Sequence, residues 1–193
     1  MRPLVYFSLD IEASGTVPPL YNMLSIGVTT LRENGDHHVL GQSFYIELKP
    51  IFPGNDPAAL AVCGLDVERL SREGVEPREA MLRLTDWVER ETGDRAISVF
   101  VGHNAVFDWS HIAYYYAHFG MENPFGYKGI DLKSLAMGRL GIGWNETSKE
   151  NLQKVLDLPL QDPARLHRAD YDAQYQALIL KKVLEWRRGE SSA

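Results

Sequence analysis

The chain has 193 residues, of which 45% are hydrophobic and 24% are charged, and this size and composition are typical of one globular domain with a sizeable core. Its net charge of −6 is the wrong sign for a protein that clamps a long nucleic acid by counterion release. No stretch approaches the ~20 apolar residues that span a bilayer, and the lone Cys63 excludes an intrachain disulfide and a Cys/His zinc cluster. We expect a single domain over residues 1–188, a disordered tail over 189–193, and a cytoplasmic, intracellular location.

Five segments predict β-strands. Three of them, rich in β-branched and aromatic residues, begin the chain: LVYFSLDI (4–11), MLSIGVTTL (23–31) and VLGQSFYIEL (39–48). The turn-forming sequence RENGD separates the second from the third, so the three strands are expected to be partly antiparallel. A buried fourth strand is predicted at AISVFVG (96–102), and a fifth at YKGID (127–131).

Helical patterns fill the remaining segments. They predict short pieces around 57–72, a helix that starts at Pro77, one from 105 to Gly120 with Asn104 as its N-cap, one over 132–140, one that Ser148 opens, and a last one over 169–187. Together with the strands they predict an α/β fold in which helices pack around a mixed five-stranded sheet.

The first strand ends in two acids. Alternate side chains of a strand share a face, so Asp10 and Glu12 are expected to project together and to chelate a hard cation such as Mg²⁺ or Mn²⁺. The spacing alone proves little, since the same D-x-E pattern recurs at Asp66 and Glu68. That second pair lies where a helix begins, so it is interpreted as a complement to the helix dipole.

A third acid, Asp108, lies one turn into the helix that follows the fourth strand, within VGHNAVFD. An acid at this position commonly interacts only with the helix dipole. The surrounding segment nevertheless marks it as a candidate site residue. His103 and Asp108 also share the H-x(4)-D spacing found near the C-terminus, which warns against relying on that spacing alone.

Near the C-terminus, the segment HRADYD contributes a fourth acid and a histidine. Asp172 begins a helical stripe that should face the core and that continues through Gln176, Ile179, Val183 and Trp186. A buried carboxylate needs compensation, either from a divalent cation or from an arginine. His167 would point about 140° away from Asp172 on a continuous helix, so we place it on the preceding loop. Histidine titrates near neutral pH and can there take a proton.

Charge is unevenly distributed along the chain. Residues 1–125 hold 9 Lys/Arg and 17 Asp/Glu, whereas residues 126–193 hold 11 and 9. A modest basic surface is therefore expected on the C-terminal third, from Lys128, Lys133, Arg139, Lys149, Lys154, Arg165 and Arg168. This balance favours short or single-stranded substrates held near their ends over extensive duplex binding.

The three segments SLDIEASG, GHNAVFD and HRADYDA resemble the three motifs of the DEDDh 3′→5′ exonucleases. This RNase H-like family includes oligoribonuclease, ribonuclease T and the proofreading epsilon subunit of bacterial DNA polymerase. AVCGLDVERL and GIDLKSLAMGRL also look like the family's connecting segments, so the resemblance covers nearly the whole chain. It implies an RNase H-like fold and the metal-dependent release of nucleoside 5′-monophosphates from 3′ ends of single-stranded RNA or DNA.

The resemblance also implies a role for each matching residue. Asp10, Glu12, Asp108 and Asp172 would hold two divalent cations, Mg²⁺ or Mn²⁺, and His167 would deprotonate the attacking water. The remaining implied contacts are to the terminal nucleotide, from Ala13, Ser14, His103 and Asn104. Several relatives form dimers, so a homodimer is compatible with the family, although the sequence shows no interface.

Substrate preference and two alternative functions stay open. Ala13 and Ser14 replace the threonines that many relatives have after the first motif, so contacts to the 3′ end are expected to differ. The acidic chain slightly favours RNA ends or short oligonucleotides. One alternative is a catalytically silent nucleic-acid-binding or scaffold protein on the same fold, which would usually lack a carboxylate. The other is a hydrolase such as a nucleotide phosphatase.

Overall fold

The computed structural model describes residues 2–186, so the tail predicted over 189–193 lies outside the described residues. The strands are β1 (Leu4–Ala13), β2 (Met23–Asn34), β3 (His37–Glu47), β4 (Ile97–Gly102) and β5 (Gly129–Asp131). The helices are α1 (Pro57–Cys63), α2 (Val67–Glu73), α3 (Pro77–Thr92), α4 (Ala105–His118), α5 (Leu132–Leu140), α6 (Lys149–Val155) and α7 (Ala169–Glu185), with a short 3₁₀ turn at Trp144–Glu146.

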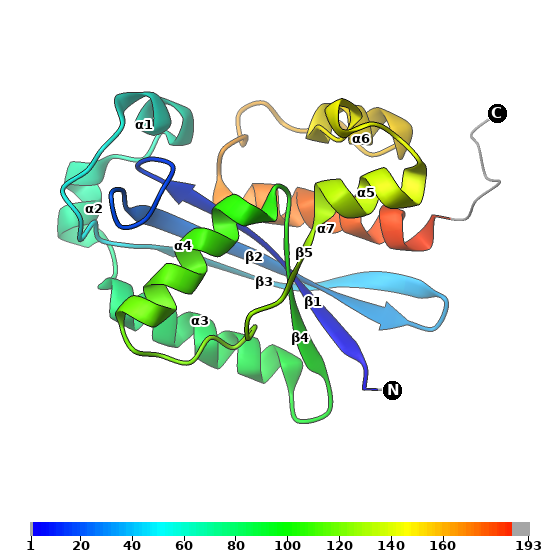
Figure 1. Ribbon diagram of the computed structural model, residues 1–193, viewed down its shortest axis with the longest axis horizontal. Coiled ribbons are helices and arrows are strands. Elements are labelled where there is room, and N and C mark those ends of the chain that lie inside the picture. The colour runs from blue at the N-terminus through cyan, green and yellow to red at the C-terminus, as the bar shows by residue number, and fades with distance from the viewer. Residues whose placement is uncertain (1, 187–193) are drawn as a thin grey trace.

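The five strands form one sheet in the order β3-β2-β1-β4-β5 (Figure 1). The first three strands pair antiparallel, whereas β4 pairs parallel with both β1 and β5. The predicted mixed five-stranded sheet is therefore confirmed. Strand β1 lies at the centre of the sheet. Ser8 is its last residue paired with β4, so beyond Ser8 that side of β1 has no neighbouring strand and lies beside the start of α4.

Helices α3 and α4 form one group against the sheet and α5–α7 another (Figure 1). The core under α3 and α4 contains Phe7, Leu9 and Ile11 of β1, whereas Tyr6 belongs to the second core with α5, α6 and α7. Ser8 donates its hydroxyl hydrogen to the carbonyl of Ala173 in α7. This alternation leaves Asp10 and Glu12, in phase with Tyr6 and Ser8, on the α7 side.

Two helix starts show how the predicted N-terminal residues are used. Asp66 caps α2 by accepting the backbone N–H groups of Glu68 and Arg69, so the second D-x-E pair has the structural role expected of it. Asn104 is the N-cap residue of α4, as predicted, but its backbone is left-handed (φ 68°) and its side chain makes no capping bond. Asp131 accepts the N–H of Ala105 instead, at 2.8 Å. The side chain that caps α4 therefore comes from a distant segment.

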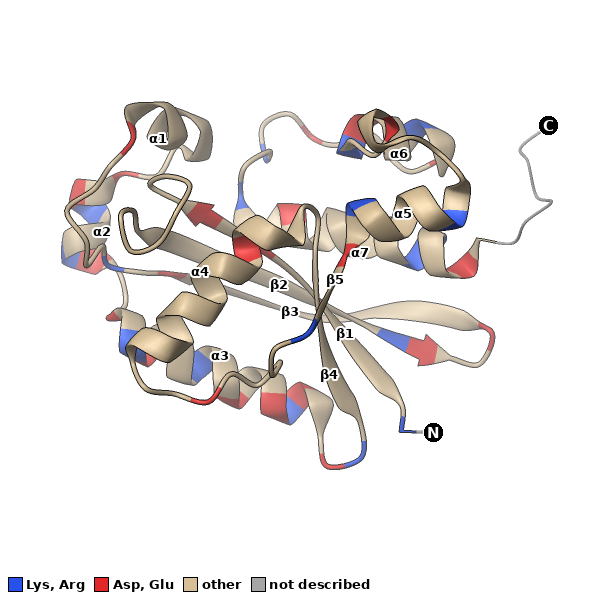
Figure 2. Cartoon of the chain, in the orientation of Figure 1, with Lys and Arg blue, Asp and Glu red and all other residues tan. Residues whose placement is uncertain are grey.

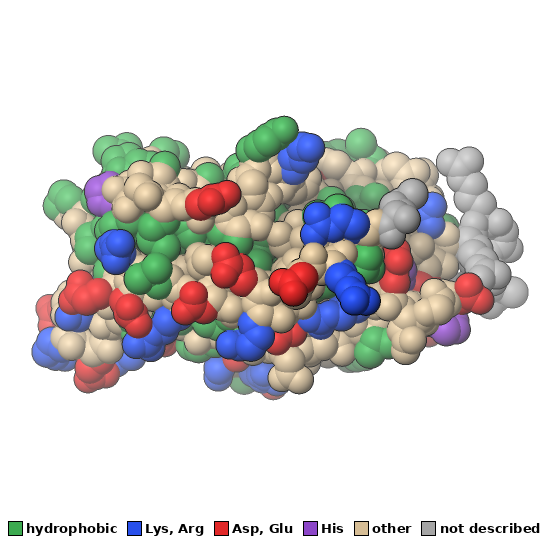
Figure 3. Space-filling view, turned by 90° about the horizontal axis from the view of Figure 1, so that it is seen from below, with side chains coloured by type: hydrophobic (Ala, Val, Ile, Leu, Met, Phe, Trp, Pro, Cys, Tyr) green, Lys and Arg blue, Asp and Glu red, His purple; other side chains and the backbone are tan. Residues whose placement is uncertain are grey.

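The basic surface predicted on the C-terminal third forms only in part, although α5 and α6 both carry basic residues (Figure 2). The Lys149 side chain turns inward and is only 19% exposed. Arg139 donates to backbone carbonyls at the end of α7, and Arg168 pairs with Asp170. On the face in Figure 3, acidic and basic side chains are interspersed without a broad area of one sign. None of the helices in residues 2–186 has the length and apolarity needed to cross a bilayer.

Candidate active site

The four carboxylates and the histidine that the sequence singled out line one pocket of about 270 Å³. It also contains Ile11, His103, Asn104, Phe107, Lys149, Glu150, Gln161 and Leu166. A larger hollow of about 780 Å³ lies between the C-terminal part of α3 and the start of β4. None of the five singled-out residues lines that hollow, so the converging chemistry assigns the candidate site to the smaller pocket.

Gln176 of α7 holds Asp10 in place. Its Nε2 donates to Asp10 Oδ1 at 2.5 Å, while its Oε1 accepts the backbone N–H of His103 at 3.1 Å. The Gln176 side chain is fully buried, so both of its polar ends are used inside the protein. One amide thus fixes a carboxylate of β1 relative to the loop that leads into α4.

Replacing Gln176 with leucine should lower the free energy of unfolding by ~1–3 kcal/mol, because the buried N–H of His103 would lose its partner. Gln174 lies two residues earlier in α7 and is exposed, so Gln174→Leu is the matched control and should leave stability nearly unchanged. Urea unfolding of both variants measures the difference. If Gln176→Leu were as stable as Gln174→Leu, the two hydrogen bonds of Gln176 would contribute nothing to the free energy of unfolding.

Asp108 closes the open end of β1. Its Oδ1 accepts the backbone N–H of Ile11 at 3.0 Å, and only 4% of the residue is exposed. Gly102 makes this approach possible, since a Cβ there would lie 3.0 Å from Ala105 Cα and 3.3 Å from Asp108 Oδ2. A side chain at Gly102 would therefore push α4, and its carboxylate, away from β1.

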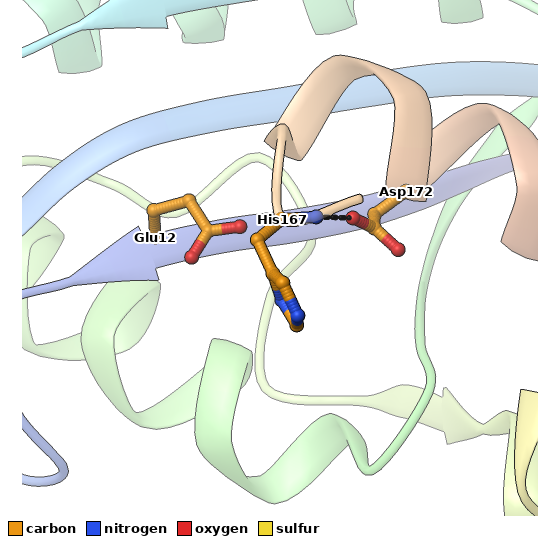
Figure 4. A group of neighbouring side chains, drawn as sticks. All are labelled: Glu12, His167 and Asp172. Atoms are coloured by element: carbon orange, nitrogen blue, oxygen red, sulfur yellow. Dashed lines mark hydrogen bonds between the residues drawn. The ribbon is translucent and has the colours of Figure 1, made fainter. Parts of the chain in front are cut away.

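Asp172 and His167 enter the pocket together from the start of α7 (Figure 4). Asp172 Oδ2 accepts the backbone N–H of His167 at 2.8 Å. His167 is exposed and precedes the helix, as predicted, with an uncommon left-handed backbone (φ 60°). One ligand atom each of Glu12, His167 and Asp172 lies within 4.8 Å of the other two. The loop conformation thus brings an imidazole next to two carboxylates.

Gly27 lets α7 reach these residues. It pairs with Asp10 on the neighbouring strand, and a Cβ at this position would lie only 2.1 Å from the backbone of Ala169. The helix start therefore rests directly on the backbone of β2, next to Asp10. Glycine inside a strand commonly marks such a close approach, and this is the signal by which Gly27 could have been found in the sequence.

The carboxylates share a largely dry environment. Burial raises the pKa of Asp10 to about 7 and that of Glu12 to about 9, because the charged forms lose solvation. Neighbouring acids contribute as well, since Asp172 raises the pKa of Asp10, and Asp10 and Asp172 raise that of Glu12. Burial also raises the pKa of Asp108. A cluster of oxygen ligands whose negative charges destabilise one another fits hard divalent cations such as Mg²⁺ or Mn²⁺.

These pKa values predict how the cation-free protein responds to pH. In the unfolded chain these carboxyl groups have ordinary pKa values near 4. Between pH ~4 and ~9 the folded state therefore binds more protons than the unfolded state. The free energy of unfolding in EDTA should therefore fall as pH rises through this window. The double variant Asp10→Asn/Glu12→Gln should show a smaller fall in urea unfolding at pH 5, 7 and 9. A curve parallel to the wild-type curve would contradict the burial argument.

Two residues of the site carried no catalytic prediction. Lys149, which had been expected on the surface, places its Nζ 2.5 Å from Asp172 Oδ1 and 3.7 Å from Asp10 Oδ1. Gln176 had been placed on the core-facing stripe of α7, and a polar residue on that stripe was the available signal. The sequence gives no comparable signal for Lys149, because the position of α6 beside the site is known only from the folded structure.

The four residues expected to contact a nucleotide fall into two groups. His103 and Asn104 line the pocket, and His103 Nε2 lies 2.8 Å from the carbonyl of Thr147, to which it must donate. Burial lowers the pKa of His103 to about 4, which keeps the ring neutral at physiological pH. Ala13 and Ser14, in contrast, are buried and do not line the pocket.

Ser14 has a structural role in this fold. Its hydroxyl donates to the carbonyl of Gly54 and accepts the N–H of Asn22, while its own N–H and carbonyl bond to Asn22 and Asp56. These internal bonds already use the polar groups of Ser14, and its nucleotide contact stays a prediction. The Ala13 side chain packs in the core, which leaves only its backbone for the predicted contact.

Known proteins share both the sequence and the fold of this chain. The 3′-5′ DNA exonuclease Cap18 of Escherichia coli is 35% identical over 179 residues, which are 93% of this chain and 91% of Cap18. Ribonuclease T of Shewanella sp. (strain W3-18-1) is 25% identical over 93% of this chain and 82% of its own. The sequence matches no protein-family model.

Among solved structures, the nuclease domain of 3′hExo, a DEDDh family member bound to rAMP, superimposes with a TM-score of 0.75. The alignment covers 97% of this chain and 96% of that domain, with 15% sequence identity. The likeness shows that the two chains share a fold. With the identity to Cap18 along nearly the full length of both proteins, it leads to one conclusion: this chain belongs to the DEDDh family of 3′→5′ exonucleases, which are phosphodiester hydrolases.

Proposed function

We propose that this exonuclease removes nucleoside 5′-monophosphates from the 3′ ends of single-stranded DNA. Asp10, Glu12, Asp108 and Asp172 hold two divalent cations, Mg²⁺ or Mn²⁺, and His167 is the general base. The observation that carries this proposal is the convergence of four carboxylates, from β1, α4 and α7, in one pocket with a histidine at its rim. A catalytically silent protein on this fold would have no need to retain such a buried, mutually repelling set.

Each side chain has a task that its position suits. Divalent cations held by the four carboxylates would neutralise the phosphate, promote ionisation of water and stabilise the leaving oxygen. Asp172 holds the His167 backbone through the 2.8 Å hydrogen bond, which keeps the imidazole at the pocket. The exposed ring of His167 then accepts a proton from the attacking water and returns it to solvent. Gln176 fixes the carboxylate of Asp10 in its orientation.

DNA is proposed as the substrate on the strength of Cap18, the 35% identical relative, which is named a DNA exonuclease. This replaces the slight preference for RNA that the acidic composition suggested. Single-stranded ends fit the net charge of −6, because a duplex clamp would need a broad basic area. A homodimer and an intracellular location stay predictions.

Single-stranded DNA and RNA of matched sequence, each labelled at the 5′ end, test the substrate proposal. With Mg²⁺ or Mn²⁺, we expect the DNA to shorten stepwise and at a higher kcat/KM than the RNA. Faster shortening of RNA would overturn the choice of DNA while leaving the exonuclease assignment intact. A parallel incubation with mononucleotides should release no phosphate. Phosphate release without strand shortening would instead support a nucleotide phosphatase.

A further inference from the structure

Among residues 2–186, Lys149 is the one lysine or arginine that enters the carboxylate cluster. Its side chain is 19% exposed, and among residues 2–186 no other Lys or Arg nitrogen lies within 4.0 Å of the four acids' carboxylate oxygens. Its Nζ lies 2.5 Å from Asp172 Oδ1 and 3.7 Å from Asp10 Oδ1. Asp172 Oδ2 meanwhile accepts the N–H of His167. Both oxygens of Asp172 therefore have partners within the protein.

The ammonium group lies against Asp172 Oδ1, one of the oxygens that would hold a divalent cation. Two positive charges a few ångströms apart in a poorly solvated pocket repel strongly. A cation that binds Asp172 through Oδ1 and the ammonium that donates to the same oxygen therefore weaken each other's binding. The long, flexible stem of lysine lets the ammonium move away without any change in the backbone.

We propose that Lys149 is a built-in counter-cation, which stabilises the cation-free cluster and which a divalent cation must displace from Asp172. This inference rests on the proposed role of the carboxylates as cation ligands. Lys149 thereby sets the affinity of the site. It lowers the affinity for divalent cations and, in exchange, reduces the repulsion between buried carboxylates when no cation is bound.

Mn²⁺ binding without nucleic acid tests the exchange, with free Mn²⁺ measured by electron paramagnetic resonance. Lys149→Met, which removes the charge and keeps an unbranched stem, should bind Mn²⁺ at least ~10-fold more tightly than wild type. Lys154→Met is the matched control, because Lys154 is exposed on the same helix. It should change the affinity less than twofold. Lys149→Arg retains the charge and should bind Mn²⁺ no more tightly than wild type.

Thermal unfolding provides a second readout that a mere packing role would not give. Lys149→Met should unfold at a lower temperature than wild type in EDTA, and the difference should disappear at saturating Mn²⁺, since the cation replaces the missing charge. A difference that persists at saturating Mn²⁺ would instead indicate a packing role and overturn the proposal. If Lys149→Met folds only with Mn²⁺, the proposal is supported.

The outcomes separate this inference from the proposed function. If wild type binds Mn²⁺ and Lys149→Met binds it equally or more weakly, the counter-cation role is wrong and the exonuclease mechanism stands. The counter-cation role is also wrong if Lys149→Met and Lys154→Met have the same Mn²⁺ affinity, or if Lys149→Arg binds Mn²⁺ as tightly as Lys149→Met. If wild type binds no Mn²⁺ at all, the proposed cation site and this inference both fail.

Discussion

Asp10→Asn should reduce exonuclease activity on the order of 10³-fold or more, because it removes one charge from the centre of the cation site, and cations stabilise the transition state by several kcal/mol. The substitution preserves shape, and the side-chain carbonyl of the introduced asparagine can still accept the hydrogen bond from Gln176. Rates of shortening of a 5′-labelled oligonucleotide at saturating Mg²⁺ measure the effect.

Stability distinguishes this loss from misfolding. The wild-type carboxylate is buried among other acids, so Asp10→Asn should unfold in EDTA at the same temperature as wild type or higher. The control is Asp66→Asn in the second D-x-E pair, which should keep full activity, because asparagine caps a helix about as well as aspartate. Near-normal activity in Asp10→Asn would refute the assignment of the metal site.

His167→Asn should lower kcat ~10²- to 10⁴-fold, the usual contribution of a general base. Asparagine is chosen because, like histidine, it tolerates the left-handed backbone found at this position (φ 60°). A loss of activity then reports on the imidazole and not on a distorted loop. His118→Asn is the control, because His118 is exposed at the end of α4 and should be dispensable.

Mn²⁺ affinity separates two roles that the position of His167 allows. A ring atom of His167 lies within 4.8 Å of ligand oxygens of Glu12 and Asp172, so the imidazole is close enough to act as a ligand. If His167 acts only as a base, His167→Asn should bind Mn²⁺ with an affinity within about threefold of the wild-type affinity. A large loss of Mn²⁺ affinity in His167→Asn would identify it as a ligand instead.

The sheet, the helices and the five singled-out residues were accessible from the sequence because each depends on a local pattern. Alternation in β1 separates Asp10 from Ile11, and the stripe of α7 carries Asp172 into the core. The resemblance of three segments to the DEDDh motifs then indicated which of these acids converge. Spacing alone failed to do so, as Asp66 in its capping role illustrates.

Contacts between distant segments were not accessible from the sequence, because their partners meet only in the folded chain. Asp131 accepts the N–H of Ala105 from 26 residues away, whereas the N-cap residue Asn104 makes no side-chain capping bond. Ser14 looked available in the sequence, yet the loop around Gly54 uses its hydroxyl. Lys149 looked like one of several surface lysines until α6 was placed beside α7. Each of these contacts depends on tertiary packing between segments far apart in the chain, and local sequence patterns do not specify it.

Product identity tests the central claim most directly. Wild-type protein with Mg²⁺ and single-stranded DNA should release nucleoside 5′-monophosphates, one at a time from the 3′ end, and should release none in EDTA. Chromatography of the products beside a gel of the 5′-labelled strand gives both answers in one experiment. Nucleoside 3′-monophosphates, internal fragments or activity that persists in EDTA would contradict a cation-dependent 3′→5′ exonuclease site built from these carboxylates.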